Sequence, residues 1–283
     1  MHVLPRDTSR PSSDSPALED RTPVVTGNGT VDSYVVYILS TAFKGAIKIG
    51  KAAMEVGLSA SMMAVNALEH GLGDKYDQSI VDPLYKATVA LGFGFGLKCS
   101  DTSSDGSRVM YKHMTLSSIL LVQAMAQLDA ASRTLVHNLH VDDGASGGLS
   151  PGERSEWQSS CVGAMAVVHT VRALEMSGAF QVFLPSVNED MQWKIDLIAQ
   201  ATDSDFGILF QVKSRYDGTT MCNIVRSDTA QNGDTHFLKG ARRFMNDTTG
   251  FWVPVNVEVR SNDTYTHPLD EDVLRALKEM ARS

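Results

Sequence analysis

The chain has 283 residues and a net charge of -8, with 43% hydrophobic and 20% charged residues. This composition fits a globular protein with a sizeable core, and it excludes a general nucleic-acid coat or a basic membrane binder, though not a local basic groove. The three widely separated cysteines predict reduced thiols in a cytoplasmic protein rather than a disulfide framework. No apolar run is long enough to span a bilayer.

The first half of the chain predicts a tail followed by helices. Residues 1–31 are rich in Pro, Ser, Thr and Asp, so we expect a flexible tail. Residues 32–145 form an expected helical domain, because apolar positions such as Val36, Leu39 and Phe43 recur at three- and four-residue steps. Within it, "GFGFG" lacks the form of a dinucleotide fingerprint and favours close helix packing or a turn.

The segment "DDGASGGLSPG" (142–152) predicts a linker, which places a domain boundary near residue 150. The pattern from Ser150 to Glu153 is that of a capping box with Pro at the first helical position, so we expect a helix from there to about Ser177.

The elements expected after that helix are strands at 180–184, 192–199 and 206–213, a helix at 235–246, a strand at 250–259 and an amphipathic C-terminal helix. Pro254 favours an edge position for the last strand. The fold class is therefore α/β: residues 150–283 form a mixed sheet flanked by helices, preceded by an all-helical region.

The second and third strands carry polar side chains that are costly to bury. Asp196 interrupts the second strand, and Gln211 and Lys213 share one face of the third. If the strands pair through "QATDSD", a carboxylate, an amide oxygen and an ammonium group lie together. Mg²⁺ prefers such oxygen ligands, and a neighbouring lysine can orient water or stabilise charge on a phosphate.

This order of elements and residues resembles the PD-(D/E)xK nuclease superfamily, over residues 150–260. The resemblance implies a restriction-endonuclease-like fold and Mg²⁺- or Mn²⁺-dependent hydrolysis of phosphodiester bonds in nucleic acid, DNA rather than RNA. It implies that Asp196 binds the metal, that Gln211 stands at the position of the usual second acid, and that Lys213 is the lysine of the motif. The backbone carbonyl of Val212 would join the metal shell. Gln211 supplies one negative charge fewer than the usual acid, which weakens metal binding.

The acidic ligand contributed upstream stays open at this point. The candidates are Glu153 and Glu156 on the first turns of the preceding helix, His169 deeper in it, and the acidic pair Glu189 and Asp190 just before the Asp196 strand. We favour Glu189.

Three arginines near the motif, Arg215, Arg242 and Arg243, are candidates for contact with a nucleic-acid phosphate backbone, and a solvated helix face explains the last two equally well. Because nucleases that make paired cuts often act as dimers, we also expect a homodimer. The alternative function is a catalytically inactive scaffold or interaction subunit that keeps the fold, for example in a mobile-element or defence complex.

Overall fold

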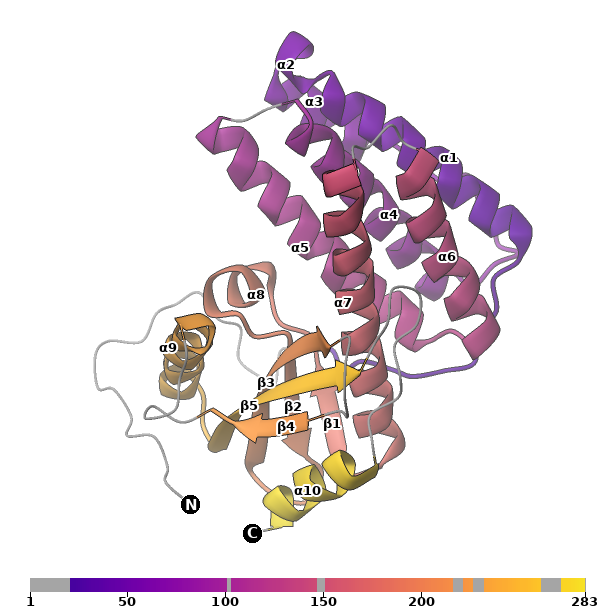
Figure 1. The fold of residues 1–283 in the computed structure, drawn as a ribbon. Helices are drawn as coiled ribbons and strands as arrows, with labels where there is room; N and C mark the ends of the chain where they lie inside the picture. Colours follow the sequence, from indigo (N-terminus) through magenta and orange to yellow (C-terminus); the bar gives the residue numbers. More distant parts are fainter. Residues whose placement is uncertain are drawn as a thin grey trace. The chain divides into compact units, whose positions relative to one another are not determined.

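The computed structural model describes residues 21–100, 103–146, 151–215, 221–225, 232–260 and 271–282. The chain divides into two compact units. One consists of residues 27–164, and the other joins the residues before 27 to those from 165 onward (Figure 1).

The first unit is helical, as the apolar periodicity predicts. Its helices are α1 (Ser33–Lys51), α2 (Ala53–Val56), α3 (Leu58–Asn66), α4 (Gln78–Lys98), α5 (Ser104–Ala126), α6 (Ala130–Ser146) and the beginning of α7 (Pro151–Met176). Local sequence fixes where several of them start. Asp32, Asp77 and Ser103 each accept a hydrogen bond from a backbone N–H of the first turn of α1, α4 and α5, respectively.

Helix α4 is the centre of this unit, with every residue from Ala87 to Leu97 buried, and it packs against both α1 and α5. The glycines of "GFGFG" make the contact with α1 possible. A Cβ on Gly96 would lie 2.4 Å from the Ile47 carbonyl oxygen, and one on Gly92 would lie 2.7 Å from that of Phe43. Close helix packing, as expected, is the role of this motif.

The predicted linker and the predicted tail both need correction. Residues 142–146 belong to α6 and residues 151–152 to α7, while 147–150, with Ser150 of the predicted capping box, lie outside the described residues. In the expected tail, residues 21–31 are packed: Val24 and Val31 are buried, and Pro23 forms a β-bridge with Phe183. Residues 1–20 lie outside the described part.

The second unit contains a five-stranded mixed sheet with the strand order β1-β2-β3-β5-β4. The strands are β1 (Phe180–Phe183), β2 (Leu197–Ala201), β3 (Phe206–Arg215), β4 (Met221–Ile224) and β5 (Phe251–Arg260). Strands β3 and β5 run parallel, and the other neighbours are antiparallel. The helices are the end of α7, α8 (Val187–Trp193), α9 (Asn232–Asp247) and α10 (Glu271–Arg282). The predicted α/β class is confirmed.

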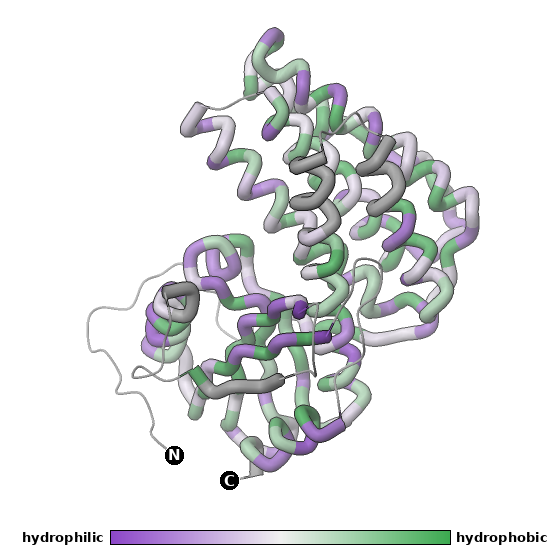
Figure 2. The backbone as a smooth tube through the Cα atoms, viewed as in Figure 1, coloured by the Kyte–Doolittle hydropathy of each residue, from purple (hydrophilic) through white to green (hydrophobic). Residues whose placement is uncertain are grey.

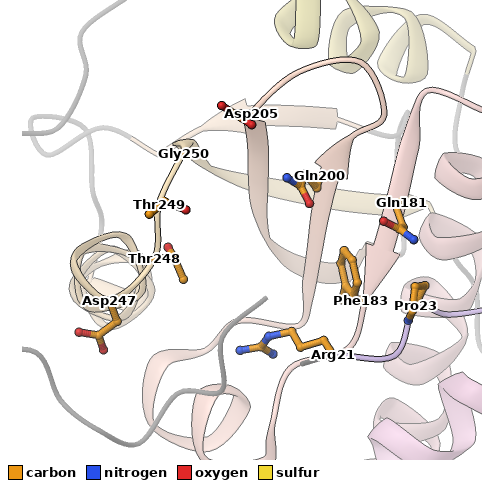
Figure 3. A pocket seen from close by; sticks show the side chains of 10 residues that line it. All are labelled: Arg21, Pro23, Gln181, Phe183, Gln200, Asp205, Asp247, Thr248, Thr249 and Gly250. Carbon is orange, nitrogen blue, oxygen red and sulfur yellow. The ribbon is translucent and has the colours of Figure 1, made fainter. Parts of the chain in front are cut away.

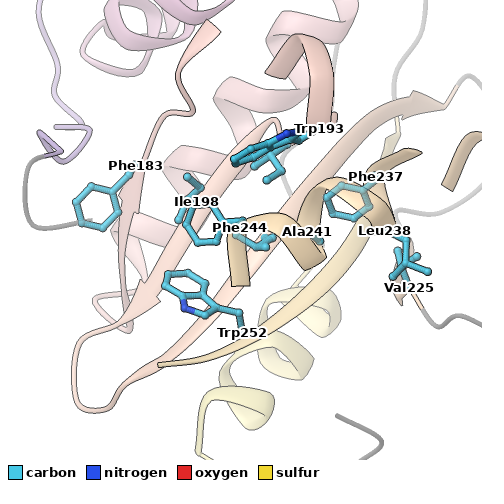
Figure 4. Close-up of a cluster of buried hydrophobic side chains, with 11 residues drawn as sticks. Phe183, Trp193, Ile198, Val225, Phe237, Leu238, Ala241, Phe244 and Trp252 are labelled. Carbon is cyan, nitrogen blue, oxygen red and sulfur yellow. The ribbon is translucent and has the colours of Figure 1, made fainter. Parts of the chain in front are cut away.

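Helices α8 and α9 cover one face of the sheet. Figure 4 shows the cluster between them, in which Trp193 of α8 and Phe237 and Phe244 of α9 meet Ile198 and Trp252 of the strands. Helix α9 presents hydrophobic residues to the sheet and hydrophilic ones outward (Figure 2). This packing fixes the position of α8 over the beginning of β2.

Two strand expectations were wrong in detail. The segment 192–199 is not one strand, because α8 runs to Trp193 and β2 begins only at Leu197. Strand β5 is not an edge, because it lies between β3 and β4. Pro254 has no N–H to donate, but its carbonyl accepts a hydrogen bond from the N–H of Val225, which directly follows β4. The missing N–H therefore lies where the ladder between β4 and β5 ends, and Pro254 is tolerated there. In the described part of the chain, none of the helices is both long and apolar enough to cross a membrane.

Candidate active site at the start of β2

Asp196 lies immediately before β2 and is held by two bonds to β3. Its backbone N–H donates to the Phe210 carbonyl at 2.8 Å, and its Oδ2 accepts from the Val212 N–H at 2.6 Å. The carboxylate therefore takes the place of a backbone acceptor in the ladder. Leu197 is paired with Phe210, so Asp196 lies at the end of this register, beside Phe210 and Val212 of β3. Its position next to Gln211, expected from the hairpin pattern, stays a prediction.

Gln211 is buried, with 9% of its surface exposed, and its Oε1 atom has no hydrogen-bond partner among the residues that the structure describes. It lies two residues after Leu209, whose side chain packs under α8 and α9, so the two side chains share that face of the sheet. A buried acceptor without a donor costs about 1–3 kcal/mol. A cation beside it would remove that cost.

The acidic partner of Asp196 is Asp190 in α8. Burial and the nearby charge of Asp190 raise the pKa of Asp196 from 3.8 to about 8. Burial also raises the pKa of Asp190 from 3.8 to about 6. Two enclosed carboxylates that resist ionisation together are typical of sites that bind a cation or exchange a proton.

Glu189, the acid favoured from the sequence, has other binding partners. Its carboxylate accepts a bond from the Ser186 N–H at 2.6 Å, completing a capping box at the start of α8. The same carboxylate forms an ion pair with both terminal nitrogens of Arg21, and Glu189 is only 1% exposed. We therefore replace Glu189 by Asp190 in the candidate metal set. The pattern Ser186-x-x-Glu189 is the sequence signal that assigns Glu189 to capping.

Lys213 is exposed on β3, and its charge, like that of Lys194, lowers the pKa of Asp196. The ammonium groups of both lysines thus lie within electrostatic reach of the Asp196 carboxylate. Val212, which binds Asp196 through its N–H, remains a predicted ligand through its carbonyl.

The remaining candidates are spread over other elements. Arg215 forms a 3.0 Å ion pair with Glu258 of β5. Arg243 is exposed and Arg242 half-buried on α9, so their contact with nucleic acid stays a prediction. His169 is half-buried on α7, and the side chains of Glu153 and Glu156 lie outside the described part. Among the described residues, no group of three His, Cys, Asp or Glu side chains could hold a metal.

A separate pocket of about 670 Å³ opens on the second unit, and Figure 3 shows its lining. Arg21 lines it, whereas Asp196, Gln211 and Lys213 do not. Its wall is polar: Arg21, Pro23, Gln181, Phe183, Gln200, Asp205, Asp247, Thr248, Thr249 and Gly250.

Comparison with known proteins gives no assignment: no family model, curated protein or solved structure matches the chain. The functional argument therefore rests on the site.

Proposed function

We propose that the second unit is a metal-dependent nuclease that hydrolyses phosphodiester bonds in nucleic acid, DNA rather than RNA. The observation that carries this proposal is the pair of Asp190 and Asp196 carboxylates held next to β3, the strand that carries buried Gln211 and exposed Lys213. The order of elements supports it: helix α7, strand β1, helix α8, the antiparallel strands β2 and β3, strand β4, helix α9, and strand β5, which runs parallel to β3. With α8 and β4 as additions, this is the order that the resemblance to PD-(D/E)xK nucleases implies.

The residues fit a hard divalent cation such as Mg²⁺ or Mn²⁺. Asp190, Asp196 and Gln211 would hold it through two carboxylates and an amide oxygen, with the Val212 carbonyl as a further oxygen. A cation also relieves the mutual repulsion that raises the pKa of Asp196. When bound, it would supply Lewis acidity toward a phosphate oxygen and a water molecule.

The chain itself contributes orientation and charge. The Val212 N–H fixes the direction of the Asp196 carboxylate, and β3, at the centre of the sheet, gives Gln211 a rigid position. Lys213 stands at the exposed rim, where its ammonium group can orient the attacking water and stabilise charge on the phosphate.

The test is a cleavage assay of the purified protein with supercoiled DNA, linear DNA and RNA, in Mg²⁺, in Mn²⁺ and in EDTA. We expect cleavage only with a metal, and a loss of at least about a hundredfold in Asp196→Asn, because the variant loses a carboxylate ligand of the metal. Lys213→Ala should lower the rate while leaving Mn²⁺ binding intact. Lys278→Ala, at a half-buried lysine of α10 that is not part of the candidate site, is the control and should cleave like the wild type.

A second candidate is a non-catalytic scaffold, favoured by the amide at residue 211 and by the absence of a third acidic, His or Cys ligand among the described residues. It predicts no cleavage under any of these conditions and no stabilisation by Mn²⁺. Cleavage that persists in Asp196→Asn at the wild-type rate would contradict the nuclease proposal, because it would come from a contaminant.

A further inference from the structure

Lys194, at the end of α8, has an unusual backbone conformation. It is the one non-glycine residue with a positive φ in the described ranges, with φ 56° and ψ 34°. This left-handed position directly after a helix is usually filled by glycine, because a Cβ makes it unfavourable. Its N–H still bonds the Asp190 carbonyl at 3.0 Å, so the turn closes α8 in the normal way. A lysine therefore occupies a position whose backbone conformation favours glycine, which has no side chain.

The neighbours of Lys194 hold it in place. Trp193 is buried between α8 and α9, and Ile195 is fully buried in the same cluster, whereas Lys194 between them is exposed. Gly240 of α9 packs directly on Trp193, where a Cβ would come within 2.4 Å of the Trp193 Cα. The lysine thus projects from a backbone anchored on both sides.

The position of Lys194 along the chain places it beside both carboxylates. Its N–H bonds the Asp190 carbonyl one helical turn earlier, and Asp196 follows it by two residues. Its charge accordingly lowers the pKa of both aspartates. With a divalent cation bound and both aspartates ionised, the cation, the two aspartates and the lysines Lys194 and Lys213 carry a net charge of +2, which suits an anionic group shared between the lysines.

We propose that Lys194 is a second substrate-contacting cation of this site, which binds a nucleic-acid phosphate from the α8 side while Lys213 acts from the β3 side. The inference rests on the proposed nuclease function. It explains why a residue other than glycine occupies the turn.

The decisive variant is Lys194→Gly, because it removes the ammonium group and relieves the backbone at the same time. Its melting temperature should equal or exceed that of the wild type. Binding of a fluorescent single-stranded or duplex DNA, measured with Ca²⁺ in place of Mg²⁺, should nevertheless weaken about tenfold, and the slope of log K against log salt should fall by about one. Lys194→Arg should restore most of the binding, and Lys278→Ala is the matched control.

The outcomes separate the two claims. If the wild type binds and cleaves nucleic acid, and Lys194→Gly keeps both the affinity and the salt slope, the role of Lys194 is wrong and the nuclease proposal stands. If the wild type neither binds nor cleaves, both claims fail together. Mn²⁺ binding, followed by thermal shift, should be equal in Lys194→Gly and the wild type, because Lys194 is no ligand. A loss of metal binding would mean a structural role and would overturn the inference.

Discussion

At the scale of single residues, the candidate site depends on Asp196 taking over a role that usually belongs to the backbone. Its carboxylate occupies an acceptor position of the β2–β3 ladder through the Val212 N–H, and its own N–H completes the bond to Phe210. One oxygen is thereby held by the Val212 N–H, and the carboxylate feels the charge of Asp190. Ionisation of Asp196 therefore changes the stability of the fold.

This gives a pH dependence of stability in the metal-free protein. The pKa of Asp196 is about 8 in the folded protein and about 4 when unfolded, so the folded state binds more protons between these values. The free energy of unfolding should therefore fall as pH rises from about 4 to 8. Urea denaturation in EDTA across this range measures it.

Asp196→Asn is the control for this prediction, because the amide oxygen can still accept from the Val212 N–H but cannot ionise. The stability difference between variant and wild type should grow in favour of the variant up to pH 8. Added Mn²⁺ should reverse the order at pH 8. A difference that stays constant over this range would contradict the enclosed position of the carboxylate.

The sequence predicts the polar residues of the candidate site but does not tell which acid of the pair Glu189 and Asp190 acts on Asp196. Period-2 alternation places Gln211 and Lys213 on one face of β3, and the register of β2 and β3 follows from the burial of Leu197 and Phe210. Glu189 and Asp190 are adjacent, and residues next to each other on a helix point in directions about 100° apart. Only the packing of α8 decides which of them faces the strands. Lys194 was missed because a left-handed backbone leaves no mark in the composition.

At the scale of elements, the contact between α1 and α4 is a backbone-to-backbone approach that glycine permits. The Cβ of an alanine at residue 96 would meet the Ile47 carbonyl oxygen and the Gly50 Cα at 2.4 and 2.8 Å. Both are backbone atoms, which cannot turn aside as a side chain does. One helix would have to move.

We expect Gly96→Ala to destabilise the protein by about 1–3 kcal/mol, the usual cost of overpacking a core. The matched control is Gly45→Ala in α1, where a new Cβ meets nothing within 4 Å. That substitution should stabilise by about 0.5–1 kcal/mol, because alanine is the better helix former. Thermal unfolding of both variants checks the pair, and equal shifts would contradict the packing described for α4.

Long, periodic elements were predictable and short ones were not. Apolar spacing predicts the helices of the first unit, helices α9 and α10, and strands β1 and β3. Tertiary context did not override this spacing. Helix α8 has seven residues, too few for a helical period to stand out, and its capping box is its clearest signal. The edge position predicted from Pro254 was wrong. Proline is disfavoured inside a sheet because it lacks an N–H donor, and at Pro254 that donor would lie where β4 has already ended.

At the scale of the whole molecule, the order of segments along the chain differs from the way in which they are grouped into packed units. The segment 21–26 precedes the helical unit but belongs to the sheet-containing unit, which it joins through Arg21, Pro23 and Val24. Arg21 is 5% exposed in its side chain and lies over the ring of Phe244 as well as pairing with Glu189. The composition of residues 1–31 concealed this, because few of them are apolar.

Removing Arg21 should therefore weaken the unit that carries the candidate site. Arg21→Ala leaves the Glu189 carboxylate buried without its cation, which costs about 3–5 kcal/mol. In the double variant Arg21→Ala, Glu189→Gln the uncompensated charge is gone, so part of the stability should return. Chemical denaturation of the wild type, Arg21→Ala, Glu189→Gln and the double variant measures the coupling. If the single and double variants are equally stable, the ion pair contributes nothing.

The ion pair between Arg21 and Glu189 joins residues 168 positions apart. During synthesis on the ribosome the arginine emerges long before its partner, by roughly ten to thirty seconds at ordinary elongation rates. Until then residues 21–26 have no sheet to pack against, because the ribosome must first synthesise the whole helical unit. The sheet-containing unit is thus assembled after the helical unit, from chain segments that lie on both sides of it in the sequence.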